Sequence, residues 1–479
     1  MSNTTIVLFR SDLRLQDHPA LSAAIRSGQR ILPVFILDED ERDWPMGSAS
    51  RWWLHHSLQA LNKSMKEFGG KLYLRYGDTL SHLQEIISKV DANKLYFCRA
   101  YEPRLRNIED KIYQRWHEKI EVKRYGGYLL FEPEDVQTGN GSPFKVFTPF
   151  WKACLKLTAP GLGNKTSINK ANFYQPHIDQ DKLEDWRLLP DKPDWASGFR
   201  DNWEPGEVGA LKSLKRFLES GLDNYDEDRD RPDYSGTSKL SPHLHFGEIS
   251  PVRIWHEVKK FSEGNKQLEK QAYSYLRELG WRDFSNHLLF HWPHISDQPF
   301  REEYKSFPWK KDMQALKAWQ MGKTGYPIVD AGMRQLWHTG WMHNRVRMIV
   351  GSLLVKHLLL HWHEGGHWFW DTLVDADLAN NSASWQWVAG SGADAAPYFR
   401  VFNPILQGKK FDPNGYYVRK WIPELKQLSD KYIHEPWEAD QQILEKAGII
   451  LGEHYPTPII DHKLGREGAL AAFKEFNDK

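Results

Sequence analysis

The stretch His361–Trp370, HWHEGGHWFW, carries residue types that can bind a metal ion. Its central part, His363–His367, matches the H-E-x-x-H pattern, in which two imidazoles one helical turn apart bind zinc and the Glu acts as a base. Gly365 and Gly366 separate these histidines, and each glycine destabilises a helix interior by ~1 kcal/mol relative to Ala. We therefore predict that the glycines end a helix beginning near Asn344, which leaves the histidines on separate elements. No third ligand stands at zinc-protease spacing, so we expect no metal site; the interleaved tryptophans suit a buried aromatic seam.

A second candidate group consists of Glu278, Trp281 and Arg282, which share one face if this stretch is helical. A carboxyl group beside an indole in an apolar pocket favours its neutral form. Glu278 is therefore a candidate hydrogen-bond or proton donor. The same spacing equally suits a surface ion pair between Glu278 and Arg282.

Two further groups carry amides, carboxylates and indoles. In a predicted helix over Asn344–His361, Asn344, Arg345 and Met348 lie opposite the apolar side, which suits either a flat polar ligand or a solvated face. Asp375, Asp377 and Asn381 precede two closely spaced indoles. Paired carboxylates of this kind can act in acid–base catalysis, or bind ribose hydroxyls or an Arg.

A glycine and three small hydroxyl residues mark a loop that leads into a helix. Gly236 is followed by Thr237, Ser238 and Ser241, whose N–H and O–H groups can donate to a phosphate. Helix capping accounts for Thr237 and Ser238 equally well.

The elements that position these residues fall into two classes. Short apolar runs alternate with amphipathic stretches in the first 130 residues, which predicts an α/β domain: a doubly wound, Rossmann-like parallel sheet with helices on both faces. No G-x-G-x-x-G follows the first run, so the dinucleotide fingerprint is absent. The predicted strands are Thr5–Phe9, Ile31–Leu37, Lys71–Tyr76, Lys94–Phe97 and Glu121–Lys123.

The composition and periodicity of the remaining chain change twice. Residues 131–200 are rich in Pro, Gly, Asn and Asp and lack clear periodicity, which is typical of a connector. Helical patterns then continue to near the end, so we predict an all-α domain. The expected organisation is an α/β domain at 1–130, a connector at 131–200 and a helical domain at 201–479. Candidate helices include Gly209–Ser220, Pro251–Lys260, Lys266–Leu279, Asp312–Gln320 and Asp330–Gly340.

Composition limits the class of protein. Lys+Arg is 64 and Asp+Glu is 63, so any nucleic-acid site must be a local patch. Two cysteines, Cys98 and Cys154, argue against a disulfide scaffold and favour a reducing compartment. No apolar run reaches ~18 residues, and the N-terminus lacks the apolar region of a signal peptide. We expect a cytoplasmic protein that does not enter a membrane.

Two parts of the chain resemble the photolyase/cryptochrome family. The opening R-x-D-L-R-x-x-D-x-x-A-L of that family is matched by Arg10–Leu21. The helical half resembles the flavin domain of DNA photolyases through the four groups above and through Phe307–Trp309, Thr324–Pro327 and Phe402–Pro404. The resemblance covers nearly the whole chain. It implies a deoxyribodipyrimidine photo-lyase, a carbon–carbon lyase that uses blue or near-UV light and reduced FAD to split cyclobutane pyrimidine dimers in DNA. The alternative is a cryptochrome-type photoreceptor without repair activity.

The resemblance also implies which residues hold FAD. Asn381 would face flavin N5, where cryptochromes tend to carry Asp or Cys, and a neutral amide suits a flavin kept reduced. Arg347 would pair with Asp375. The full cofactor-binding set is Tyr225, Thr237, Ser238, Lys239, Leu240, Ser241, Tyr275, Arg347, Asp375, Asp377 and Asn381.

For the lesion, the resemblance implies that the indoles of Trp281 and Trp387 form two apolar walls of its binding site. It also implies three further residues that contact the dimer. Glu278 and Asn344 would hydrogen-bond to the dimer and Met348 would pack on it. Asn344 and Met348 stand where enzymes that repair (6-4) photoproducts carry histidines, which favours cyclobutane dimers. The catalytic set is Glu278, Asn344, Met348 and Asn381, and the DNA- or lesion-binding set is Arg229, Glu278, Trp281, Arg282, Asn344, Arg345, Met348, Trp387 and Gln407.

Electron supply and light harvesting complete the implied scheme. Trp385, Trp362 and Trp309 would be the flavin-proximal, middle and surface members of a chain that photoreduces FAD. We also expect a second antenna chromophore, methenyltetrahydrofolate or 8-hydroxy-5-deazaflavin. The Asn-Glu pair of one folate-binding branch is missing after Tyr101 and Glu102. The expected partner is UV-damaged DNA, and the expected state is a monomer.

Overall fold

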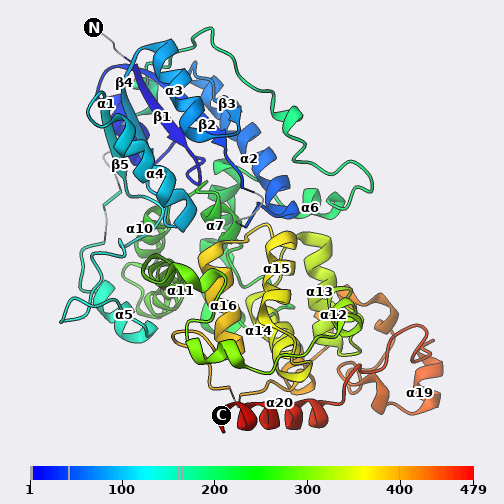
Figure 1. Ribbon diagram of the computed structural model, residues 1–479. Coiled ribbons are helices and arrows are strands. Elements are labelled where there is room, and N and C mark those ends of the chain that lie inside the picture. Colours follow the sequence, from blue (N-terminus) through cyan, green and yellow to red (C-terminus); the bar gives the residue numbers. More distant parts are fainter. Residues whose placement is uncertain (1–3, 41–43, 160, 163–166, 399, 479) are drawn as a thin grey trace. The chain divides into compact units, whose positions relative to one another are not determined.

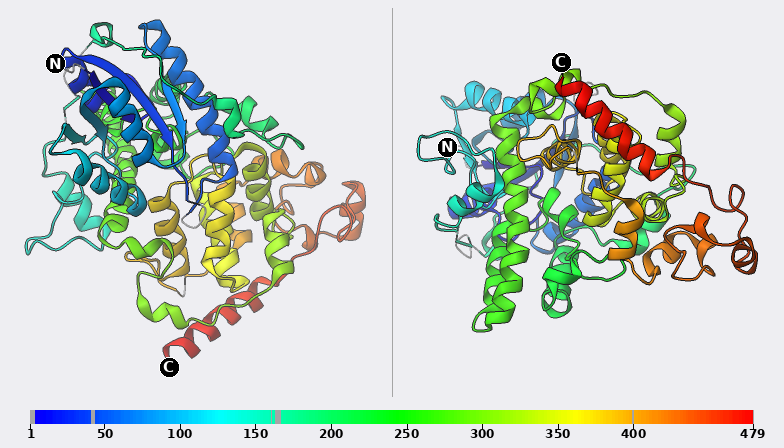
Figure 2. Two further views of the ribbon diagram at one scale, coloured as in Figure 1. Left: turned by 45° about the horizontal axis from the view of Figure 1, so that its top comes forward. Right: turned by 90° about the horizontal axis from the view of Figure 1, so that it is seen from below.

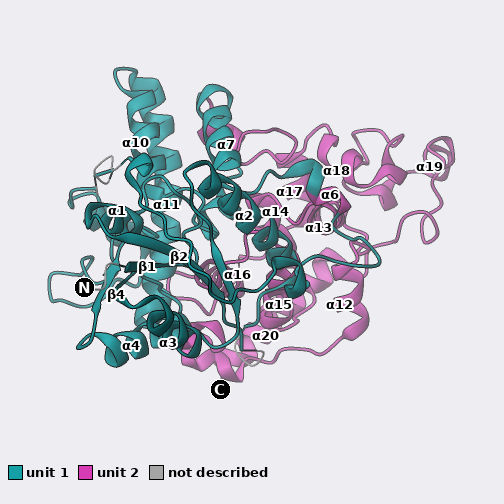
Figure 3. Ribbon diagram, turned by 90° about the horizontal axis from the view of Figure 1, so that it is seen from above, with its two compact units in different colours: residues 1–196, 200–223, 238–293 teal, residues 197–199, 224–237, 294–479 magenta. Residues whose placement is uncertain are grey.

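The computed structural model describes residues 4–40, 44–159, 161–162, 167–398 and 400–478. Contacts divide the chain into two compact units, coloured in Figure 3. Unit 1 consists of residues 1–196, 200–223 and 238–293, and unit 2 of residues 197–199, 224–237 and 294–479. Each unit is built from several separate segments of the chain, whereas we expected continuous domains with boundaries near residues 130 and 200. Those domain boundaries stay a prediction.

Unit 1 contains the predicted parallel sheet (Figure 1). All five strands are present in the order β3-β2-β1-β4-β5, and every neighbouring pair is parallel. Strand ends differ from the predicted ends by no more than two residues. The strands are β1 (Thr4–Phe9), β2 (Arg30–Leu37), β3 (Tyr73–Tyr76), β4 (Ala92–Cys98) and β5 (Glu121–Tyr125).

The central strand is covered on both sides, because every residue of β1 is buried. Ile6 and Leu8 pack into one apolar cluster together with Leu83 and Ile112 from two connecting helices. Alternate residues face the other side, where the Phe9 ring lies 4.7 Å from the ring of His18. The connecting helices are α1 (Pro19–Arg26), α2 (Ser48–Glu67), α3 (Thr79–Val90) and α4 (Pro103–Trp116).

Unit 1 also includes most of the predicted connector and the first helices of the helical half. The longest helix, α11 (Lys266–His291), continues past its predicted end at Leu279. Gly280 lies inside this helix. A Cβ at this position would come 2.4 Å from the Trp151 ring, so the glycine permits close packing. The other helices are α5 (Phe147–Cys154), α7 (Glu207–Ser220), α9 (Ser241–His245) and α10 (Pro251–Ser262), while α6 (Ser197–Asn202) contains the boundary between the units.

Unit 2 is helical, as expected, and the helix predicted over Asn344–His361 begins at Asn344 but ends before its predicted end at His361. α14 (Asn344–Ser352) passes into a π-helical turn, Leu353–His357, and Leu359 then adopts a left-handed φ of 54°. A new helix, α15, follows (Trp362–Thr372). The remaining helices are α8 (Tyr225–Asp228), α12 (Met313–Gln320), α13 (Pro327–Thr339), α16 (Leu378–Ala389), α17 (Pro404–Phe411), α18 (Tyr416–Trp421), α19 (Gln441–Lys446) and α20 (His462–Asn477).

The last helix of unit 2 packs on the π-helical turn. Gly465 of α20 lies against His357, and a ring nitrogen of His357 is 2.9 Å from one of His462. Figure 2 shows α20, coloured red, in two further views. Within the described residues, no helix is both long and apolar enough to cross a membrane.

Candidate functional site

The H-E-x-x-H stretch forms one continuous helix, so our prediction that its glycines end a helix is wrong. α15 begins at Trp362, where the His361 side chain caps it by accepting the His363 N–H at 3.1 Å. His363 therefore shares α15 with His367, and their ring centroids are 5.8 Å apart. A Cβ on Gly365 would lie 2.0 Å from Cη2 of Trp385 on α16. The missing side chain lets α15 and α16 pack closely, and this contact explains the glycine.

The described residues do contain one group of three metal-ligand types, but it lies elsewhere, at Asp12, His18 and Cys98. His18 Nδ1 accepts the Leu21 N–H at 3.1 Å, and Nε2 lies 3.0 Å from an Asp12 carboxylate oxygen. Burial raises the pKa of Asp12, but His18 and the Arg10 amide lower it, so that it is about 2. Both imidazole nitrogens are engaged within the protein, which is typical of a structural histidine.

The carboxylates and amide expected to contact a flavin are organised within unit 2. The predicted Arg347–Asp375 contact is present, with Nη2 at 2.8 and 3.1 Å from the two carboxylate oxygens. Asp377 caps α16 by accepting the Asn380 N–H at 2.9 Å. One turn on, Asn381 Nδ2 donates to the Gly366 carbonyl at 3.0 Å. That bond fixes the orientation of the Asn381 amide and leaves its oxygen as an acceptor.

Unit 2 also brings the predicted DNA-contacting side chains into one region. The Arg345 guanidinium binds Asp230 at 2.7 Å and lies 4.5 Å from the Phe411 ring centroid. Gln407 is one turn before Phe411 on α17, so the two share a face. Arg229 directly precedes Asp230. Arg345 therefore connects α14 with the segment next to Arg229 and with the face of α17 that carries Gln407.

The exposed side of α14 carries the residues predicted for the lesion. Val346, Ile349 and Val350 are buried, as expected for the core side. Asn344 is exposed and Met348 is partly exposed, with its sulfur 3.8 Å from Arg345 Nη1. Asn344 and Met348, one turn apart, are therefore available to a ligand.

The three tryptophans expected to carry electrons differ in burial. Trp385 and Trp362 are 3% and 2% exposed, and Trp309 is partly buried. The Trp385 ring is 5.0 Å from that of Phe369, while Trp309 and Trp362 both contact the ring of His361. Trp309 is thus the most exposed of the three, as a surface member would be, and the electron-transfer roles stay predictions.

In unit 1, α11 presents Tyr275, Glu278 and Trp281. Tyr275 is buried against Phe217, with ring centroids 4.3 Å apart, and burial raises its pKa. Trp281 stacks on Phe147 of α5, with ring centroids 3.6 Å apart and planes 9° from parallel. Glu278 is partly exposed. The sequence did not single out Phe147; its only signal was the aromatic cluster within the predicted connector.

Arg282 does not fit its predicted role as a DNA or lesion contact. Its side chain is buried and its guanidinium stacks 4.0 Å from the Tyr128 ring centroid. Nη1 and Nη2 donate to the carbonyls of Tyr128 and Leu244, at 2.6 and 3.4 Å. The guanidinium is thus used inside unit 1, because α11 has packed elements on the side that was expected to face a ligand.

The hydroxyl-rich loop leads into a helix as predicted. Lys239 has a left-handed φ of 53°, and Ser238 Oγ accepts the Leu240 N–H at 3.3 Å. α9 then begins at Ser241. A turn that leads into a helix start in this way is the kind of arrangement that binds phosphate in other proteins.

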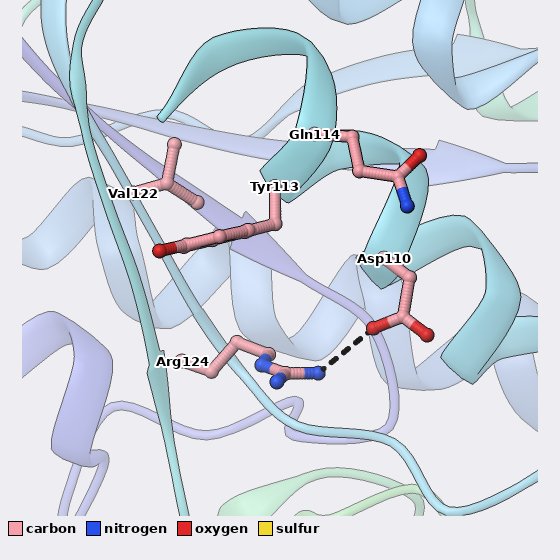
Figure 4. Close-up of a pocket in the computed structure, with 5 residues that line it drawn as sticks. All are labelled: Asp110, Tyr113, Gln114, Val122 and Arg124. Carbon is pink, nitrogen blue, oxygen red and sulfur yellow. Dashed lines mark hydrogen bonds and ion pairs between the residues drawn. The ribbon is translucent and has the colours of Figure 1, made fainter. Parts of the chain in front are cut away.

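A small surface pocket in unit 1 contains none of the predicted site residues. It lies between α4 and β5 and is lined by Asp110, Tyr113, Gln114, Val122 and Arg124, with Arg124 contacting Asp110 at 3.4 Å (Figure 4). Its volume of about 220 Å³ is below the range of typical ligand sites. We do not assign it to a cofactor.

Two family models match the chain. Residues 5–166 match the DNA photolyase model, and residues 275–475 match the FAD binding domain of DNA photolyase. The chain belongs to the photolyase/cryptochrome family. The expected fold class is thereby confirmed, and the second matched range is an FAD-binding domain of this family.

Relatives of this photolyase/cryptochrome family member include proteins named as photo-lyases and proteins named as cryptochromes. A deoxyribodipyrimidine photo-lyase from Agrobacterium fabrum is 48% identical over 98% of this chain and 97% of that protein. Cryptochrome-2 from Arabidopsis thaliana is 38% identical over 98% of this chain and 78% of that protein. The solved structure of a bacterial class III photolyase from Agrobacterium tumefaciens gives a TM-score of 0.94 at 46% identity, covering 100% of this chain and 98% of that one.

The residues present fit an FAD group of this family. Asp375 is neutralised by Arg347, so it does not repel an anionic ligand. The fixed Asn381 amide and the capping Asp377 offer polar partners close together on α16. Tyr225 and Thr237–Ser241 precede the matched FAD-binding range, which begins at Tyr275.

Proposed function

We propose that the protein is a deoxyribodipyrimidine photo-lyase, a carbon–carbon lyase that splits cyclobutane pyrimidine dimers in DNA under blue or near-UV light. The observation that carries this proposal is the Asn381 amide held by the Gly366 carbonyl. A neutral, fixed amide does not compete for a proton beside a reduced flavin. The 48% identical relative named as a photo-lyase supports the same conclusion.

In unit 2, we propose that Tyr225, Thr237, Arg347, Asp375, Asp377 and Asn381 hold FAD. In unit 1, the corresponding residues are Ser238, Lys239, Leu240, Ser241 and Tyr275. These residues would hold FAD, which in its reduced form would supply light-driven one-electron chemistry for splitting the dimer. The Arg347–Asp375 pair keeps charge balanced around this group, and the 238–241 turn contributes backbone donors for its diphosphate.

Lesion recognition is proposed to rest on stacking and on a hydrogen-bond donor. A cyclobutane dimer stacks and pairs poorly, so flipping it out of the duplex costs less than flipping an intact base. Trp281 is already held by its stack on Phe147, and it offers a rigid apolar surface. Glu278 is proposed to donate a hydrogen bond to the dimer carbonyls, where negative charge develops during splitting. In unit 2, Asn344, Met348 and Trp387 are proposed as further lesion contacts.

DNA binding is proposed for the region around Arg345. Arg229, Arg345 and Gln407 would contact the phosphates beside the lesion, and Arg345 would exchange Asp230 for a phosphate. Binding should therefore weaken as salt rises. Arg282 is excluded from this set because its guanidinium is used internally.

Several finer features extend the same proposal. An antenna chromophore, methenyltetrahydrofolate or 8-hydroxy-5-deazaflavin, would bind the α/β domain at residues 1–130. The connector at 131–200 joins this domain to the helical repair domain at 201–479. Trp309, Trp362 and Trp385 would photoreduce oxidised FAD. We propose that the protein acts as a monomer in the cytoplasm on UV-damaged DNA.

The decisive test is repair by the purified, FAD-loaded and chemically reduced protein. Dimer-containing DNA is illuminated with blue light, and dimers are counted against a dark control. We expect light-dependent loss of dimers. Survival of the dimers with intact flavin would refute repair and favour the second candidate, a cryptochrome-type photoreceptor, which the 38% identity to cryptochrome-2 supports.

A further inference from the structure

The imidazole of His361 lies between two indoles of unit 2. Its ring centroid is 5.4 Å from that of Trp309 and 5.6 Å from that of Trp362. Among the described residues, each of these indoles has a ring contact with His361, and no ring contact joins the indoles to each other. A path from Trp309 to Trp362 that follows ring contacts therefore passes through His361.

The position of this imidazole is fixed by the start of α15. Nδ1 accepts the His363 N–H at 3.1 Å, so His361 is the N-cap of the helix that carries Trp362. The bond also assigns the ring proton to Nε2 in the neutral imidazole. The ring cannot turn away from Trp362 without uncapping α15.

The surroundings of His361 and His363 favour their neutral imidazoles. Burial, followed by the nearby His367, lowers the pKa of His361. Burial and the neighbouring imidazoles lower the pKa of His363, whose ring is 3.9 Å from Trp362, to about 4. Neutral imidazoles at His361 and His363 add no positive charge that would oppose one on Trp362.

We propose that His361 is a positioning residue of the tryptophan chain, whose ring provides the contact through which an electron passes from Trp309 to oxidised Trp362. This inference rests on the proposed function and adds a residue that is not a tryptophan to the path. The primary oxidant is a light-excited oxidised flavin. In the step itself one electron leaves Trp309 and fills the vacancy on Trp362, so positive charge moves outward. No covalent bond changes, and His361 is neither oxidised nor reduced.

Two substitutions separate the ring of His361 from its capping role. His361→Asn removes the ring but keeps a side-chain acceptor, and Asn is a favoured N-cap. His361→Phe keeps a ring and removes the acceptor. Circular dichroism and thermal unfolding establish that each FAD-loaded variant is folded.

Flash photolysis of the oxidised, FAD-loaded proteins then follows the electron. We expect the signal of oxidised Trp309 to be lost in His361→Asn and kept in His361→Phe; Trp309→Phe identifies that signal by its absence. A wild-type signal in His361→Asn would overturn the proposal. Loss of the signal in folded His361→Phe would overturn it as well.

A measurement in the dark tests the same geometry without electron transfer. Ring currents of the two indoles should displace the imidazole proton resonances of His361, and Trp309→Phe should shift them. Unshifted resonances would contradict the contact. Failure of the wild-type protein to repair dimers would refute the proposed function alone, because neither the dark spectrum nor the Trp309 signal depends on repair.

Discussion

Gly365 approaches the indole of Trp385 so closely that a Cβ at this position would lie 2.0 Å from Cη2. The adjacent Gly366 has room, since its Cβ would come no closer than 3.7 Å to the same ring. The first glycine position thus has no space for a side chain, whereas the second has space for a methyl group. The sequence alone does not distinguish the two positions.

We therefore expect opposite effects from the two alanine substitutions. Gly365→Ala forces Trp385 to move and should lower the free energy of unfolding by about 1–3 kcal/mol, as overpacked cores do. Gly366→Ala is the matched control and should be neutral or stabilising by up to ~1 kcal/mol, because Ala favours a helix interior. Urea unfolding of both variants measures the difference. Equal destabilisation would mean that the Trp385 contact is not what requires Gly365.

The Arg347–Asp375 pair should couple folding to flavin binding. Asp375 is 4% exposed at its side chain and Arg347 is 24% exposed, so losing the guanidinium leaves a nearly buried carboxylate without its partner. We expect Arg347→Met to cost about 1.5–3 kcal/mol, the range for hydrogen bonds to charged groups. It should also weaken FAD retention.

A double-mutant cycle isolates this pair. Asp375→Asn removes the charge, so Arg347→Met should cost less in the Asp375→Asn background than in the wild type. Urea unfolding and the release of flavin absorbance are the two measurements. Strict additivity of the two substitutions would contradict the coupling.

Glu278 should affect repair and not flavin binding. Glu278→Ala removes the proposed hydrogen bond to the lesion, worth about 1.5–3 kcal/mol, so splitting should slow by roughly tenfold or more. Glu278→Gln retains an N–H donor and should recover part of the yield. The measurement is dimers split per absorbed photon, with FAD content determined in parallel. Unchanged yield in Glu278→Ala would remove Glu278 from the mechanism.

Asp283 should make stability fall as pH rises. Burial raises the pKa of Asp283 to about 7, against the lowering effects of Arg282 and of the Phe131 and Leu130 amides, which donate to its carboxylate at 3.0 Å. Between the ordinary value of 3.8 and about 7, the folded protein holds a proton that the unfolded chain has released. The free energy of unfolding should therefore decrease across this window and level off above it.

Asp283→Asn tests this assignment, because an amide keeps an acceptor for the two N–H groups and does not titrate. Unfolding by urea at pH 5, 6, 7 and 8 should show a flatter profile for Asp283→Asn than for the wild type. Parallel profiles would assign the pH dependence to other groups.

Much of the architecture followed from local patterns. The strands were predictable because buried parallel strands are short apolar runs, and the Arg347–Asp375 contact followed from the family resemblance. Gly280 and Gly365 were harder, because the role of a glycine inside a helix depends on an indole distant in sequence. Arg282 was misassigned for a related reason. Helical spacing predicts which residues share a helix face, but it does not predict whether a ligand or another part of the protein contacts that face. Phe147 went unnoticed because its stacking partner, Trp281, is far along the chain.

The break between α14 and α15 separates two sets of side chains. In one continuous helix, the directions of the two sets would be fixed relative to each other. Asn344 and Met348 stand on a helix with its own cap, while Trp362 and Gly365 stand on another. An inserted or deleted residue in the π-helical turn would rotate one set without rotating the other. We therefore expect that the proposed lesion contacts and the proposed electron-transfer residues can diverge by independent mutations in descendants of this protein.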